Sequence, residues 1–200
     1  RHNVTWNTDP SWDNRETEGI LANTDFIAGA KVLSQKGLSL DIMQSFPQMP
    51  EIAVFAKAVP ELPIIVNHIG GVSRVGIFAG KDDEIIPVWK AGITALAACP
   101  NVTMKLGGMG MPRFGYDWHA REVPIGSEEL AEAMHPWMEH CIEQFGPDRC
   151  MFESNFPPDK VSFSYNVMYN AFKRLSKEYS ASDRAALFHD TAVRVYGIEA

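Results

Sequence analysis

Polar side chains follow several apolar runs of this sequence, at the point where each run ends. The stretch "LPIIVNHIGG" (62–71) places His68 directly after aliphatic residues, and "RCMFESNFP" (149–157) places Glu153 and Asn155 after another apolar run. Histidine and carboxylate side chains are common general acids and bases, and an amide can orient water or substrate by hydrogen bonds. These three residues are therefore candidates for a catalytic site.

Two further polar residues occur in similar runs and are candidates for substrate binding. Gln44 ends "LSLDIMQ" (38–44), and Lys105 lies within "NVTMKLGG" (101–108). A buried lysine is costly unless its head reaches a partner. Lys105 therefore either extends into a binding site or pairs with an acid, and Glu153 is a candidate for a purely structural ion pair.

The other candidates also have structural interpretations. A histidine among apolar residues is often a hydrogen-bonded core group, although the position of His68 at a strand end before Gly70-Gly71 weighs equally for a functional role. Asn155 could cap the turn that follows it, as asparagine often does.

The loop "MPRFGYDWH" (111–119) offers a guanidinium group and aromatic rings. Arg113, Tyr116 and Trp118 could hold a substrate carboxylate, because arginine binds carboxylates through a planar pair of donors. An aromatic loop that packs on a neighbouring subunit is the equal alternative, so a homo-oligomer stays open.

The remaining histidines do not form a recognisable metal-binding pattern. His135 and His140 are five residues apart on one predicted helix, which is poor spacing for sharing an ion, and neither HxH nor HExxH occurs. The residues taken alone therefore indicate no metal site.

The apolar runs themselves predict the strands of a parallel sheet. They are continuously apolar rather than alternating, which is typical of strands buried on both faces. The four strong runs span 38–44, 62–71, 101–108 and 149–157, and a weaker one spans 1–6.

Helical patterns separate these runs. They span 24–37, 49–62, 85–100, 127–146, 165–179 and 180–197. Thr24 is the expected N-cap of the first and Gly37 its C-terminal glycine, and Pro136 is expected to break or kink the fourth. The stretches 71–86 and 107–127 are predicted to be long loops.

Strict alternation of strand and helix predicts an α/β fold. The Pro-bearing turns that precede several strands favour a (β/α) barrel over a doubly wound sheet. In such a barrel the chemistry lies at the C-terminal ends of the strands, where the candidate residues occur. We therefore expect Gln44, His68, Lys105 and Asn155 to open on one mouth.

Composition limits the partners of the protein. The 200 residues suit one globular domain, and the net charge of -7 argues against a nucleic-acid partner. No apolar run is long enough to cross a bilayer, so no membrane partner is expected. Three cysteines without CxxC spacing favour a reducing compartment, and hence a cytoplasmic protein. The expected partner is a small-molecule substrate.

Taken in order, "PIIVNHIGG", "NVTMKLGG", "RCMFESNFP" and "ALFHDTAVRVYGI" resemble the C-terminal part of the amidohydrolase-related barrels. The similarity is to the amidohydrolase 2 branch, with its sugar-acid and pyrone-dicarboxylate lactonases and carboxymuconate-semialdehyde decarboxylases. It implies a (β/α)8 TIM barrel. Residues 1–200 would form the C-terminal portion of this single domain, with strands 4 to 8 and their helices. The N-terminal strands, which carry the family's HxH pair, would be absent from this chain.

The resemblance also implies roles for individual residues. The family's "DH(L/M)G" matches "NHIG", which makes His68 the counterpart of a site histidine and a candidate metal ligand. Its "K(L/I)SG" matches "KLGG", so Lys105 is adjacent to the site. Its "GSDWP" matches "ESNFP", so Asn155 stands where the family has an aspartate that acts as a base or binds metal. An amide is neither a base nor a good ligand. The cofactor is therefore open between a divalent metal such as zinc and a metal-independent site.

The leading hypothesis is a hydrolase acting on a small carboxylate-bearing lactone, ester or amide. His68 would polarise the carbonyl group, Arg113 or Lys105 would bind the carboxylate, and Asn155 would orient water or substrate. Glu153 or the absent segment would supply a base. The alternatives are a decarboxylase or other lyase on the same fold, and a non-catalytic barrel whose site has decayed.

Overall fold

Five parallel strands form one sheet, and their spatial order is their order in the chain. The computed structural model describes residues 2–6 and 17–199. The strands are β1 (His2–Asn3), β2 (Leu40–Met43), β3 (Ile64–Val66), β4 (Val102–Leu106) and β5 (Cys150–Phe152). Every neighbouring pair is parallel. The predicted strands and the α/β class are therefore confirmed.

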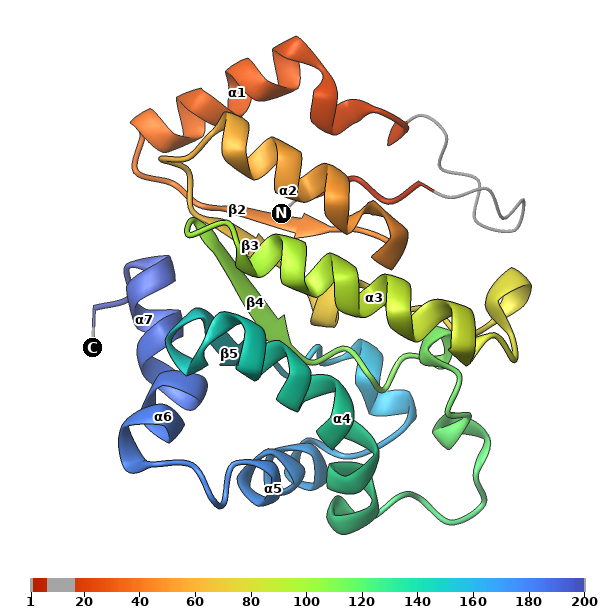
Figure 1. Cartoon of the computed structure of the whole chain (residues 1–200). Helices are drawn as coiled ribbons and strands as arrows, with labels where there is room; N and C mark the ends of the chain where they lie inside the picture. The colour runs from red at the N-terminus through yellow and green to blue at the C-terminus, as the bar shows by residue number, and fades with distance from the viewer. Residues whose placement is uncertain (1, 7–16, 200) are drawn as a thin grey trace.

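Helices connect the strands and cover the sheet. They are α1 (Thr24–Gln35), α2 (Met49–Ala58), α3 (Asp82–Ala97), α4 (Ser127–Phe145), α5 (Tyr165–Leu175), α6 (Ala181–Ala185) and α7 (Thr191–Tyr196). Helices α2, α3 and α4 follow one another across one side of the sheet, and α5 to α7 gather at its β5 end (Figure 1). None of these helices combines the length and apolar character needed to cross a membrane.

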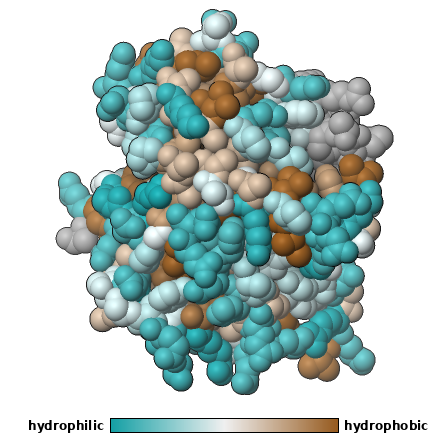
Figure 2. Space-filling model, in the orientation of Figure 1, coloured by the Kyte–Doolittle hydropathy of each residue, from teal (hydrophilic) through white to brown (hydrophobic). Residues whose placement is uncertain are grey.

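The core lies between the sheet and helices α2 to α4. The strand register aligns Leu40, Ile64 and Val102, all buried on the helix-covered face. Trp89 of α3 is also buried there. Ile65 is fully buried although it points to the opposite face, so this central strand is enclosed on both sides, as its continuous apolar run predicted. The face of the molecule shown in Figure 2 is mostly hydrophilic, with separate hydrophobic patches.

The ends of α1 show one confirmed and one wrong prediction. Asn23, rather than Thr24, is the N-cap, and its side chain accepts hydrogen bonds from two backbone N–H groups of the first turn. At the other end Gly37 takes a left-handed φ of 67°, and the Leu38 N–H donates to Leu33 O at 3.0 Å. This is the glycine-ended cap that the sequence predicted.

Two helices differ from their predicted form. Helix α3 begins at Asp82, three residues before the predicted start, and its acidic first turn stabilises the positive end of the helix dipole. The preceding loop is correspondingly shorter. Helix α4 runs without interruption through Pro136, because this proline is on the exposed side of the helix and the carbonyl group it leaves unbonded can meet water.

Candidate functional site

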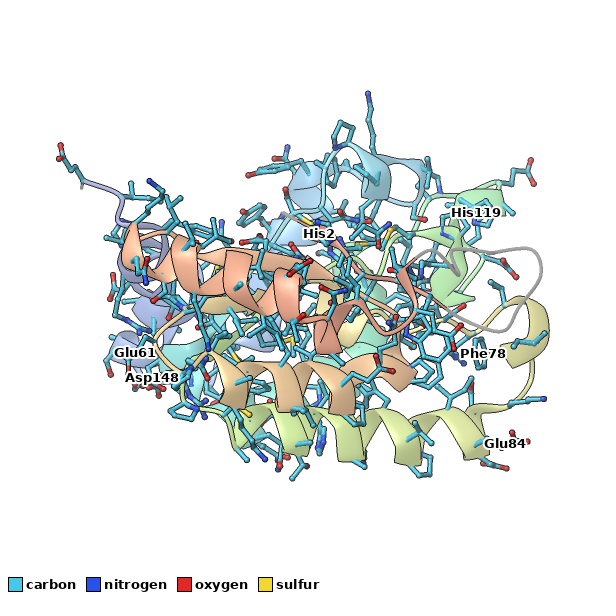
Figure 3. All side chains as sticks on the ribbon, turned by 90° about the horizontal axis from the view of Figure 1, so that it is seen from above. His2, Glu61, Phe78, Glu84, His119 and Asp148 are labelled. Carbon is cyan, nitrogen blue, oxygen red and sulfur yellow. The ribbon has the colours of Figure 1, made fainter. Side chains whose placement is uncertain are left out.

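Turns that lead into the strands and loops that follow the strands lie at opposite ends of the sheet. Glu61 and Asp148, in turns leading into β3 and β5, lie at one end of the molecule in Figure 3. Phe78 and His119, in the loops that follow β3 and β4, lie at the opposite end. The second end is where the strands finish, and it holds the candidate residues.

His68 follows β3 directly and is fixed by its backbone. Its φ of 55° is left-handed, and its side chain is only 4% exposed. The residue packs closely on Gly108, where an added Cβ would lie 2.6 Å from the Cβ of His68. Gly108 itself has a φ of 76°. A left-handed histidine is uncommon and costs energy, which the surrounding loops must supply.

Glu153 binds His68 through one carboxylate oxygen. Oε1 of Glu153 contacts Nδ1 of the imidazole and also accepts a hydrogen bond from the backbone N–H of His68 at 3.0 Å. A carboxylate only accepts, so Nδ1 carries the proton of a neutral ring and Nε2 is the basic nitrogen. The Glu153 side chain is 13% exposed. The two residues therefore form a carboxylate–imidazole pair of the kind that enzymes use for proton transfer.

Asn155 belongs to a second pair, which the sequence did not reveal. Its Nδ2 donates to Oδ1 of Asp159 at 2.6 Å, and the Gly110 N–H donates to Oδ2 at 3.0 Å. Asp159 is 1% exposed, and this burial raises the pKa of its carboxyl group to about 6. The only sequence signal was an acid directly after two prolines, where a surface turn would be expected.

The strand ends earlier than the sequence suggested, and this separates the two pairs. In an extended strand, residues two positions apart such as Glu153 and Asn155 would point the same way. Strand β5 ends at Phe152, however, and Asn155 has a left-handed φ of 47°. The two side chains therefore reach different partners.

Lys105 forms an ion pair with Asp41 of β2. Its Nζ donates to Oδ2 of Asp41 at 2.6 Å, and the Tyr196 hydroxyl also contacts that carboxylate at 3.0 Å. Asp41 is level with Thr103 in the register, two residues before Lys105, and the ammonium group also donates to Oδ1 of Asn67 at 3.4 Å. Burial acts to lower the pKa of Lys105, but hydrogen bonds with Asp41 and Tyr196 outweigh it and raise the pKa. The partner of Lys105 is thus Asp41 and not Glu153.

Gln44 and Arg113 join the loops at the strand ends. The buried Gln44 donates from Nε2 to Asn67 O at 3.1 Å. The carbonyl oxygen of Gly71 accepts from Nη2 of Arg113 at 2.7 Å and from the Phe46 N–H at 3.1 Å. Burial lowers the pKa of Arg113. Through these bonds, the loops after β2, β3 and β4 hold one another in place.

Tyr116 and Trp118 stack within their own loop. Their ring centroids are 4.3 Å apart, and the Tyr116 hydroxyl donates to Ala133 O of α4 at 3.2 Å. Beside them is a pocket of about 520 Å³. It is lined by Val75, Met111, Pro112, Arg113, Asp117 and His119. The structure brings His68 and Glu153 into contact, whereas the contacts of Tyr116 and Trp118 described above are with each other and with Ala133. Their role in substrate binding stays a prediction.

The described residues do not form a complete metal site. Among residues 2–6 and 17–199, no group of three or more His, Cys, Asp or Glu side chains is placed to hold an ion. His68 and Glu153 could supply two ligands, whereas catalytic zinc sites use three protein ligands. A metal would therefore need ligands from outside this described set.

Parallel strands, helices on their outer side and polar residues at the carboxyl ends define this chain as part of a (β/α)-barrel protein. The chain belongs to the amidohydrolase family (Amidohydro_2), whose sequence profile matches residues 1–198. The resemblance found in the sequence is thereby confirmed.

Proteins similar in sequence include an uncharacterized protein and a lactonase. The chain is 33% identical over 199 residues to the uncharacterized protein y4mH of Sinorhizobium fredii, covering 99% of this chain and 60% of that protein. It is 25% identical over 187 residues to the L-fucono-1,5-lactonase of Burkholderia multivorans, covering 93% and 60%. The chain thus spans about 60% of the length of these relatives.

Solved structures agree on the fold. A Burkholderia multivorans amidohydrolase with bound zinc superposes with a TM-score of 0.81 at 24% identity, over all of this chain and 64% of that one. Amidohydrolase 2 from Bifidobacterium longum subsp. infantis gives 0.64 at 22% identity, over 94% and 60%. These similarities support a partial TIM barrel.

Proposed function

We propose that the protein hydrolyses a small lactone, with His68 as the proton-transfer group. The observation that carries this proposal is the contact between His68 and Glu153 at the ends of β3 and β5. The named L-fucono-1,5-lactonase and L-rhamnono-gamma-lactonase relatives support a lactone as the substrate class.

The pair can perform both proton transfers of the reaction. Nε2 of His68 takes a proton from water as the water oxygen attacks the lactone carbonyl carbon. Glu153 then stabilises the resulting imidazolium ion. When the ring C–O bond breaks, the leaving oxygen receives that proton from Nε2, and the product is a hydroxy acid. The sequence suggested that His68 polarises the carbonyl group and that Glu153 is a candidate base. In this proposal His68 is the base, and Glu153 acts through the imidazole.

Binding of a substrate carboxylate remains a separate proposal. Arg113 and Lys105 already donate to Gly71 O and Asp41, so each would have to exchange or share its present partner. Arg113 also lines the 520 Å³ pocket, and this favours it over Lys105.

We also infer that these residues form strands 4 to 8 of one barrel domain. The coverage of 60–64% of the relatives' lengths supports this inference. The remaining strands would come from a segment outside residues 1–200.

The test is a rate measurement on the full-length protein with sugar-acid 1,5- and γ-lactones. Hydrolysis is detected at pH 7 to 8 by the protons that the acid product releases. We expect hydrolysis above the buffer rate, and a kcat about 10²-fold to 10⁴-fold lower in His68→Gln. Parallel assays with chelator and with added zinc report on a metal. Folded protein that releases carbon dioxide from a carboxylated substrate, and hydrolyses no lactone, would identify the lyase alternative instead.

A further inference from the structure

Asp159 is a buried carboxylate that the proposed proton transfers do not use. Both of its oxygens are engaged: Oδ1 accepts from Nδ2 of Asn155 at 2.6 Å, and Oδ2 accepts from the Gly110 N–H at 3.0 Å. Gly110 fits closely against it, because an added Cβ would lie 2.8 Å from the Cβ and Cγ of Asp159. The carboxylate is therefore held between the loop after β4 and the loop after β5.

This contact determines which way the amide of Asn155 faces. An ionised carboxylate accepts hydrogen bonds and donates none, so it must meet the NH2 group of the amide. The planar amide then directs its oxygen away from Asp159. Within residues 2–6 and 17–199, no hydrogen bond engages Oδ1 of Asn155, and Asn155 is partly exposed whereas Asp159 is buried.

We propose that Asp159 is a positioning residue that fixes the amide of Asn155 so that its oxygen Oδ1 is presented to the substrate side as a hydrogen-bond acceptor. Asn155 then offers one oxygen as a carboxylate would, but without the charge. The group that Oδ1 receives is an O–H donor, either the attacking water or a hydroxyl of a polyhydroxylated substrate. This inference rests on the proposed function and adds to it the group that orients the reacting O–H.

The surrounding charges explain why an amide suits this position. Glu153 and His68 are the titratable groups that act on Asp159 through space, and the effects are opposite: Glu153 raises its pKa and His68 lowers it. A carboxylate at position 155 would lie beside Asp159 and would add a third negative charge to the same region. Two carboxyl groups at 2.6 Å cannot both ionise readily, so an aspartate there would have to share a proton with Asp159.

The protonation state of Asp159 gives the arrangement a measurable signature. Burial raises the pKa of this carboxyl group to about 6, so it is an acceptor at pH 7.5 and a donor at pH 5. A protonated carboxyl group can donate to Oδ1, which releases the amide from its single orientation. The environment of the Asn155 NH2 group should therefore change between these pH values.

The test combines a spectroscopic measurement with kinetics on the full-length protein. The side-chain ¹⁵N–¹H signals of Asn155, assigned by their loss in Asn155→Ala, are followed from pH 4.5 to 8. We expect a titration with its midpoint near pH 6 that is absent in Asp159→Asn. The proposal would be overturned if the Asn155 signals changed neither with pH nor in Asp159→Asn, whether or not any lactone is hydrolysed.

Kinetics separates positioning from a structural role. We expect Asp159→Asn to lower kcat at least about tenfold with KM changed less than about twofold, as for a lost orienting contact. Asp83→Asn, at an exposed position of α3, is the matched control and should keep kcat. Should Asp159→Asn fail to fold, Asn155→Ala takes its place with the same expected kcat loss. A kcat equal to wild type in the folded variant would contradict the proposal.

Discussion

At the scale of single residues, one oxygen of Glu153 contacts both the backbone and the ring of His68. Oε1 accepts from the backbone N–H and also contacts Nδ1 of the ring. The first contact holds the left-handed backbone, and the second sets the tautomer and balances the charge of a protonated ring. An amide at this position would keep an oxygen for the backbone contact but would lack the charge.

We therefore expect Glu153→Gln to leave the fold intact and to lower kcat. A loss of about 10²-fold or more is expected, because general base catalysis contributes this much and depends on a stabilised imidazolium ion. The measurement is the pH dependence of kcat alongside thermal unfolding. Glu132→Gln, at an exposed position of α4, serves as control. An unchanged kcat in the folded variant would show that proton transfer does not pass through this pair.

The residues of the pair were predictable from sequence, but the pairing was not. His68 and Glu153 each end an apolar run, and that position identified them. Their contact joins residues 85 positions apart. In the same way, pairing with an acid was one of two alternatives that the sequence left open for Lys105, yet the sequence could not choose Asp41 over Glu153, because that choice depends on the strand register.

At the scale of elements, the loops after the strands are held together at Gly71. Its φ of 71° is left-handed, and its Cα approaches the backbone carbonyl group of Gln44 so closely that an added Cβ would overlap the oxygen. Its own carbonyl oxygen accepts from Arg113 and Phe46. The position of His68 therefore depends on a glycine three residues later.

Replacement of this glycine tests that dependence. Gly80 has nearly the same φ, 69°, but no atom lies within 4 Å of an added Cβ, so Gly80→Ala is a matched control. We expect Gly80→Ala to lower the free energy of unfolding by about 1 to 2 kcal/mol, the cost of a left-handed alanine. Gly71→Ala should cost about 3 kcal/mol or more, since overpacking adds to that strain. Equal losses of unfolding free energy in denaturant titrations would show that the close contact between Gly71 and the Gln44 carbonyl group does not hold the loops together.

Strands and helices differed in how well the sequence located their ends. Continuous apolar runs predicted all four strong strands, because burial on both faces leaves a clear pattern. The start of α3 at Asp82 was missed because charged residues in a first helical turn look like a loop. The continuity of α4 through Pro136 depends on which side of the helix faces solvent, and that is known only after the helices pack.

At the scale of the whole molecule, the core reaches the edge of the described sheet. Strand β5 has a neighbour on one side only, yet Cys150 is fully buried and its Sγ contacts Cys141 O of α4. Cys141 and Cys99 are also buried. Burial raises the pKa of both Cys141 and Cys150, which suppresses the reactive thiolate form.

All three thiols should consequently resist modification in the folded protein. We expect Ellman's reagent at pH 8 to label less than about one thiol in native buffer, because buried cysteines are inert, and to label all three in guanidinium chloride. The denatured sample is the internal control. Rapid stoichiometric labelling without denaturant would show that the β5 end of the molecule opens to solvent.

The agreement between strand order and chain order has a consequence for synthesis on the ribosome. Each described strand after β1 emerges when a neighbouring strand has already been made, so this sheet can grow one strand at a time from β1 to β5. Glu153 and Asn155 follow β5, the last of the described strands, and His68 is translated 85 residues before its carboxylate. A nascent chain that stops after β4 therefore carries the histidine but not its partner, and the proposed proton transfer requires that β5 has joined the sheet.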